Sequence, residues 1–163
     1  MNLTYEYNVV PGVMPVDTAA TAISTQYVDI KTANSVEFLA AFGVVTSASA
    51  DQPVTITVMA ATAQAGTGAA AVAFTYRLSS AVAANSWGDP TAATATGYAP
   101  VATTIGGKML HIYLDPAAIA AAKADARWVC LTITPDAGVT ACNVCAIPLY
   151  SPRYPGASMV SAT

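Results

Sequence analysis

Charge is what this sequence lacks most. Of its 163 residues, 6 are Lys or Arg and 9 are Asp or Glu, about a third of the share in an average globular domain. The net charge is −3, and no cluster of cations could neutralise a run of nucleic-acid phosphates. The six basic residues are scattered along the chain, at Lys31, Arg77, Lys108, Lys123, Arg127 and Arg153. We therefore expect no nucleic-acid partner, and a surface this neutral favours association with other proteins.

Long apolar runs are also absent. Hydrophobic residues make up 55% of the chain, but 36 of them are alanine. No stretch reaches the ~20 consecutive apolar residues of a membrane-spanning helix, and even Val36–Val45 is interrupted by Glu37. We expect no membrane partner. Met1–Val10 carries Glu6 and no basic residue, so it lacks the start of a secretion signal, and we expect synthesis in the cytoplasm.

Cysteine and histidine are too few for an obvious metal or redox site. Cys142 and Cys145 form a CxxC motif which, with Cys130 and His111, could in principle make a Cys3His zinc site. The spacing does not match a zinc ribbon, and a CxxC within a strand points its sulfur atoms to opposite faces. We therefore predict free, partly buried thiols, and no metal or other cofactor.

No motif with a catalytic mechanism is present. The single histidine is His111, and the chain has no G-x-S-x-G motif whose serine it could deprotonate as a base. It alternates with Leu110 and Ile112, which is typical of a residue on one face of a strand. The nine carboxylates form no close pair in the sequence, and Gly66–Gly68 lacks the rest of a phosphate-binding loop. We predict that the protein is not an enzyme. A polysaccharide hydrolase with a site assembled from distant strands is the alternative in that class.

Alternation with a period of two dominates the chain. Each run is rich in β-branched or aromatic residues and is bounded by Gly, Pro, Asp or Ser, which is typical of strands. The runs are about 23–30, 36–44, 54–58, 72–78, 110–114, 129–133 and 144–149. Seven or eight strands joined by polar turns predict an all-β fold, a single antiparallel β-sandwich domain over residues 1–163.

Five segments interrupt this pattern. Residues 115–124 predict one short helix, because Asp115 can cap it and Pro116 suits its first position. Residues 61–70 and 81–107 predict long loops. Prolines near both ends predict extended arms or edge strands, with an N-terminal arm over 1–17 and a C-terminal arm over 148–163.

Six aromatic residues lie in these arms and loops and not in the alternating strands: Tyr5, Tyr7, Trp87, Tyr98, Tyr150 and Tyr154. Such residues anchor protein interfaces because they bury a large area at low entropic cost. The alternatives are stacking on sugar rings or folding back onto the molecule's own core. We predict a protein interface that includes Tyr5, Tyr7, Trp87, Tyr98, Arg153 and Tyr154.

The order of segments carries a resemblance. A proline-containing arm leads into TQYVDI, then SVEFLAAFGVV, then a strand followed by ATAQAGTGAAAVAF, and the chain closes with NVCAIPLYSPRYPG. This order resembles the small structural proteins encoded among the head genes of tailed bacteriophages and prophages, some of which are capsid decoration, or cement, proteins. The resemblance spans roughly residues 27–156 and brings no catalytic residue.

The resemblance implies a jelly-roll-like β-sandwich that decorates and stabilises a capsid by binding across major capsid protein subunits. It implies location on the capsid exterior, with the protein also associating with itself as a homodimer or homotrimer. The alternative is a phage tail or fibre component that binds host surface glycan, with Trp87 and Tyr98 as the sugar platform.

Overall fold

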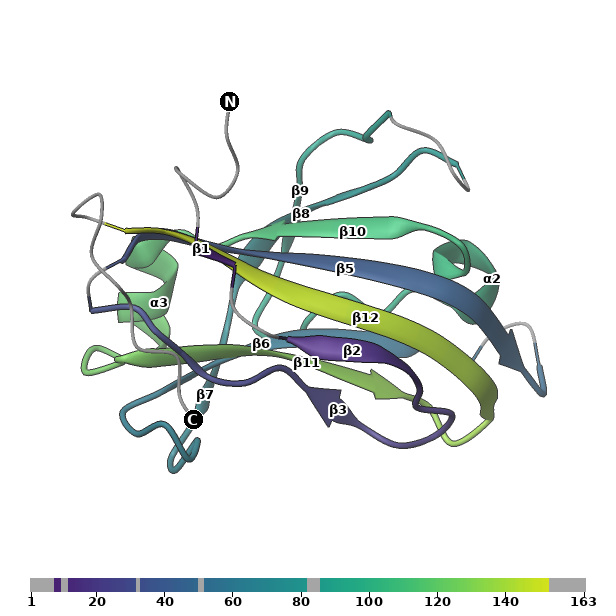
Figure 1. Ribbon diagram of the computed structural model, residues 1–163, viewed down its shortest axis with the longest axis horizontal. Helices are drawn as coiled ribbons and strands as arrows, with labels where there is room; N and C mark the ends of the chain where they lie inside the picture. The colour runs from purple at the N-terminus through teal and green to yellow at the C-terminus, as the bar shows by residue number, and fades with distance from the viewer. Residues whose placement is uncertain (1–7, 10–11, 32, 50–51, 82–85, 153–163) are drawn as a thin grey trace.

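Two antiparallel sheets pack face to face in the computed structural model, which describes residues 8–9, 12–31, 33–49, 52–81 and 86–152 (Figure 1). The larger sheet contains, in spatial order, β1 (Asn8–Val9), β12 (Val139–Pro152), β5 (Ala33–Ser47), β10 (Met109–Tyr113), β8 (Phe74–Leu78) and β9 (Thr91–Ala93), and β2 (Val13–Asp17) also pairs with β12. The smaller sheet contains β3 (Ile23–Ser24), β11 (Trp128–Pro135), β6 (Val54–Ala61) and β7 (Ala70–Val72), and β4 (Val28–Asp29) also pairs with β11. The predicted all-β sandwich is confirmed. Its jelly-roll topology stays a prediction.

The core lies between the two sheets and follows the period-two pattern of the sequence. Val36, Phe38, Ala40 and Phe42 of β5 are all buried, while Glu37 between them is not. Neighbouring core side chains come from β10 of the same sheet, and facing ones come from β6 and β11 of the smaller sheet. Fully buried residues alternate in these strands too: Leu110, Ile112, Val54, Ile56, Val58, Val129, Leu131 and Ile133. Each such side chain contributes about 1.5–3 kcal/mol by leaving water, so the alternation decides which face of each strand turns inward.

The predicted helix is present, and a second one was missed. Helix α3 (Pro116–Ala122) begins after Asp115, whose carboxylate accepts a hydrogen bond from the Ala117 N–H at 2.8 Å. Helix α2 (Ala102–Ile105) lies within the segment predicted as a long loop. Its four residues show no helical period, and Ile105 is buried against the core. Figure 1 places α2 and α3 at opposite ends of the larger sheet.

The predicted arms are shorter than the sequence suggested. Strand β12 continues through Pro148 to Pro152, which lies opposite Ala33 of β5. At the other end, residues 13–17 form β2 on the far side of β12. Pro148 lies between the part of β12 that pairs with β1 and the part that pairs with β2, so its missing N–H falls outside both ladders. A proline therefore need not end a strand, and residues 13–17 and 148–152 belong to the sheet rather than to arms.

Candidate functional site

The outer face of the seven-stranded sheet is defined by the register of its strands. Residues directly opposite one another in antiparallel strands share a face. One row across the sheet contains Val9, Leu149, Glu37, Tyr113 and Thr75. The next row contains Ile147, Leu39, His111 and Arg77. A third contains Cys145, Ala41 and Met109. The face is therefore largely apolar, with its charged groups near the centre and on the β8 side.

Within the described part of the chain, exposed large hydrophobic side chains occur only on the larger sheet and the segment beside it. All but Val16 lie on this outer face, because Val16 is opposite the buried Val144 of β12. Among the described residues they are Val9, Met14, Val16, Val44, Trp87, Met109 and Tyr113. Six belong to β1, β2, β5 and β10 of the larger sheet, and Trp87 forms a β-bridge with Ser79 at the end of β8. The outer face of the smaller sheet carries four threonines and, further along the same strands, apolar residues that are buried or only partly exposed: Thr55, Thr57, Thr132, Thr134, Met59, Trp128 and Cys130. An apolar patch on one side only is the usual mark of an interaction surface.

A hydrophobic strip forms the first part of the outer face. We define it by the exposed side chains Val9, Met14 and Val44 and the partly exposed side chains Cys145, Ile147 and Leu149. Met14 is 75% exposed and Val44 61% exposed. Near Met14, β2 carries one residue more than β12, and near Val44, β5 does the same. Each of these bulges turns two neighbouring side chains outward.

A hydrogen-bonded polar pair separates the strip from the rest of the face. The His111 ring donates a hydrogen bond from Nε2 to Oε2 of Glu37, at 2.7 Å. The Trp87 ring meets the His111 ring edge-on, with 6.1 Å between the ring centroids. The His111 ring thus lies between a carboxylate and an indole, which fixes its position on the sheet. His111 thus lies on one face of a strand, as its alternation with Leu110 and Ile112 predicted.

Beyond this pair lies a hollow of about 240 Å³. Its walls come from β8, β10 and the segment before β9, and the lining residues are Thr75, Tyr76, Arg77, Pro90, His111 and Tyr113. Tyr113, which lines the hollow, is 44% exposed, and Trp87, which packs edge-on against the lining residue His111, is 39% exposed. Arg77 supplies a guanidinium group next to them. None of the ion pairs found among the described residues includes Arg77.

The structure places the sequence-predicted interface residues differently. Trp87 is exposed on the outer face, as an interface anchor should be. Tyr98 is half-buried, stacks on Tyr76 and packs against the core, which was the alternative considered for it. Burial and the neighbouring Tyr76 raise the pKa of Tyr98 to about 12. The other four residues lie outside the described residues: Tyr5, Tyr7, Arg153 and Tyr154.

Sequence reasoning missed Arg77, Tyr113 and the Glu37–His111 pair. Their signal was present, because each alternates with buried residues and so had to face away from the core. What the sequence did not contain was the register that aligns β5, β10 and β8. Glu37 and His111 are 74 positions apart.

The three thiols are free and lie apart from one another. Cys142 belongs to the core, and Cys145 on the same strand is partly exposed on the outer face, so the CxxC sulfurs point to opposite faces as predicted. Burial raises the pKa of both the Cys142 and Cys130 thiols, and Cys130 lies beside the Tyr27 hydroxyl. Within the described part of the chain, no three His, Cys, Asp or Glu side chains gather closely enough to hold a metal ion.

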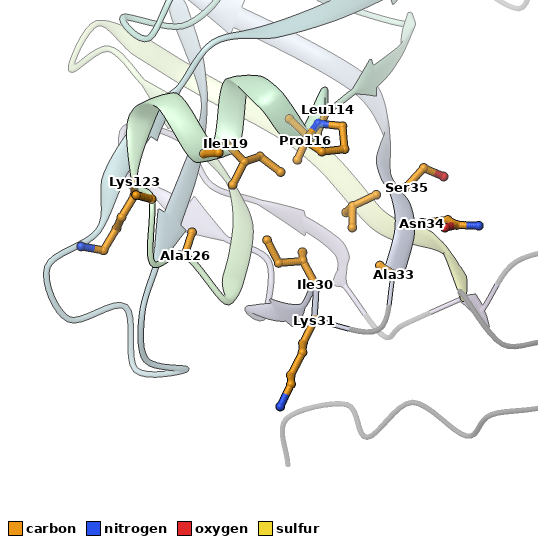
Figure 2. A pocket seen from close by; sticks show the side chains of 13 residues that line it. Ile30, Lys31, Ala33, Asn34, Ser35, Leu114, Pro116, Ile119, Lys123 and Ala126 are labelled. Atoms are coloured by element: carbon orange, nitrogen blue, oxygen red, sulfur yellow. The ribbon is translucent and has the colours of Figure 1, made fainter.

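A second pocket lies at the end of the sandwich that carries α3. It has a volume of about 270 Å³ and is lined by Ile30, Val36, Leu114 and Ile119 among others. Figure 2 shows the side chains of Lys31 and Lys123 pointing away from it. Lys123 lies 3.4 Å from Asp125 instead. This pocket is an apolar recess between helix and sheet, and we assign no chemistry to it.

Neither a protein-family model nor a curated protein nor a solved structure matches this chain. The described residues also include no helix long and apolar enough to cross a membrane. The resemblance to phage head proteins therefore stays a prediction.

Proposed function

We propose that the protein is a virion structural protein that decorates and stabilises a tailed-phage capsid from its exterior. In this proposal it binds across major capsid protein subunits through the outer face of the seven-stranded sheet. The observation that supports the proposal is that, among the described residues, all exposed large hydrophobic side chains except Val16 lie on that face. Leaving such side chains in water is unfavourable, and a partner that covers them recovers about 25 cal/mol for each Å² buried.

The dimensions of the face suit a durable interface. Strands β5 and β12 have 15 and 14 residues and run side by side, which gives the face a length of about 45 Å at ~3.3 Å per residue. A stable protein interface buries ~800 Å² on each partner, and a sheet face of this length can supply most of that area. Binding at repeated positions over a shell adds avidity.

The low charge of the chain supports the same proposal. Six basic and nine acidic residues leave little repulsion between neighbouring copies, so many copies can crowd on one surface. The proposed mechanism is non-covalent clamping, and the protein also associates with itself as a dimer or trimer. It needs no cofactor and no chemical step.

Co-sedimentation with capsids that lack the protein tests this proposal. We expect saturation at a fixed small-integer ratio of bound protein to major capsid protein. Val44→Lys and Met14→Lys place a charge on the strip and should weaken binding at least about tenfold, since burying an unpaired charge is costly. Thr134→Lys adds the same charge to the opposite sheet and is the matched control. Absence of binding, or only a few copies per particle, contradicts the proposal.

A further inference from the structure

We infer that the hollow between β8 and β10 is an anchor site for a carboxylate side chain carried by the docking segment of the partner protein, with Arg77 as its counter-ion. This inference rests on the proposed function and deepens it. It names the chemistry of the partner: a protein segment in which Asp or Glu stands next to an apolar residue.

The size of the hollow favours a side chain over a small-molecule ligand. Its volume of about 240 Å³ lies below the ~300–1,000 Å³ of typical ligand pockets. The register of β8 and β10 fixes its walls, because Arg77 lies opposite His111 and Thr75 lies opposite Tyr113. Pro90 adds a rigid wall from outside these two strands. The site is therefore built mainly on paired strands, which hold their side chains in place.

The charges around the hollow leave the Arg77 guanidinium available to pair with a carboxylate of the partner. The nearest carboxylate on the same rows of the sheet is Glu37, and its Oε2 accepts a hydrogen bond from His111 at 2.7 Å. Asp89, next to Pro90, takes part in no ion pair among the described residues, and neither does Arg77. A guanidinium presents donors in a planar fork that fits a carboxylate, and this pairing is strongest where water is partly excluded.

The composition of the rim is that of an interface hot spot. Residues that dominate binding free energy at protein interfaces are enriched in Trp, Tyr and Arg and cluster around well-packed pockets. Here Tyr113 and Arg77 line one hollow, Trp87 packs against its lining residue His111, and the hydrophobic strip lies on the same face. The strip would supply buried area, and the hollow would supply specificity and orientation.

Charge-changing variants test the inference in the capsid co-sedimentation titration. Arg77→Glu should weaken binding at least about tenfold, and Arg77→Lys less, because lysine keeps the charge but loses the planar fork. Glu37→Gln should bind equally or more tightly, since it removes a negative charge near the guanidinium and keeps an acceptor for His111. Lys31→Glu, at the end of the sandwich, makes the same change in net charge and should bind within about twofold of wild type.

Salt dependence gives a second readout. Raising NaCl should weaken the wild-type complex more than the Arg77→Gln complex, because only the former contains the proposed charge pair. Equal thermal melting of all variants shows that the fold is unaffected.

The possible results separate this inference from the proposed function. If the strip variants lose capsid binding and Arg77→Glu does not, the anchor site is wrong and the decoration role stands. If wild type binds no capsids, the proposed function fails, and the same variants are then titrated with an acidic oligosaccharide. Binding there that requires Arg77 would replace the protein partner by a glycan and overturn the inference.

Discussion

Tyr98 stacks on Tyr76, with the ring centroids 4.1 Å apart and the ring planes 21° from parallel. Tyr76 belongs to β8 of the larger sheet, while the Tyr98 backbone exchanges two hydrogen bonds with Ile56 of β6 in the smaller sheet, at 2.8 and 2.9 Å. One residue of the long 81–107 segment therefore ties the two sheets together. Trp87, in the same segment, stays exposed.

This difference predicts opposite effects of two aromatic substitutions. Tyr98→Ala should lower the free energy of unfolding by about 2–3 kcal/mol, because it removes a partly buried ring stacked against the core. Trp87→Ala should change it by less than about 1 kcal/mol, and should weaken capsid binding instead. Urea denaturation of both variants, together with co-sedimentation, measures the two effects. A strongly destabilised Trp87→Ala would place that ring in the core rather than at an interface.

Gly97 allows this contact to form, and its replacement should be costly. Its φ is +93°, and a Cβ added there would lie 2.4 Å from the backbone oxygen of Ile56. Gly97→Ala should therefore destabilise the protein by about 3 kcal/mol or more, from left-handed strain and a backbone clash together.

Gly68 provides the control for this prediction. Its φ of +63° is also left-handed, but a Cβ there meets nothing within 4 Å. Gly68→Ala should show only the conformational cost, about 1 kcal/mol. Denaturant unfolding of the two variants side by side separates the clash from the strain, and equal losses would contradict the assigned contact.

Asp17 should make the attachment of β2 sensitive to acid. Its carboxylate accepts hydrogen bonds from the Cys142 N–H at 2.8 Å and the Ala19 N–H at 3.0 Å, and these hold its pKa below the ordinary 3.8. Because the pKa is lowered on folding, the stabilisation is fully present above the unfolded-state pKa and is lost as the pH falls through the folded-state value.

Melting temperatures across pH check this prediction. Asp17→Ala should melt below wild type at neutral pH, and the two should converge as the pH falls below 3.8 and through the lowered pKa of Asp17. Asp89→Ala, which removes a carboxylate without a side-chain hydrogen bond among the described residues, should show no such convergence. A difference in melting temperature between wild type and Asp17→Ala that stays constant at every pH would contradict the prediction.

Cys145 offers a native probe of the outer face. Cys130 and Cys142 are buried and burial raises the pKa of each thiol, so both should react slowly with a thiol reagent. Cys145 is partly exposed on the strip. We expect one reactive thiol in the native protein, three after unfolding, and none in Cys145→Ser before unfolding.

Capsid binding should protect Cys145 if the strip is covered. The rate of its modification should fall several-fold when the protein is bound to capsids, because a packed interface excludes the reagent. An unchanged rate in a fully bound sample would show that another face of the molecule makes the contact.

Local features of the fold were predictable because they have local causes. The alternation around Phe38 and Phe42 and the cap at Asp115 can each be identified from a few adjacent residues, and each is confirmed. Helix α2 was not predictable in this way. Its start is held by a hydrogen bond from the Ala102 N–H to the carbonyl of Gln52, at 3.1 Å, far away in the sequence.

The sequence by itself determined which side chains of each strand turn inward, because the hydrophobic effect acts on each residue according to its apolar area, whichever residues come to lie beside it. It also determined a surface poor in charge. Only the tertiary structure decided that Arg77 lies beside His111, that Glu37 is paired, and that Tyr98 is half-buried while Trp87 is exposed. Strand order and register join residues distant in sequence, and they are settled by the packing of the whole core rather than by any single segment.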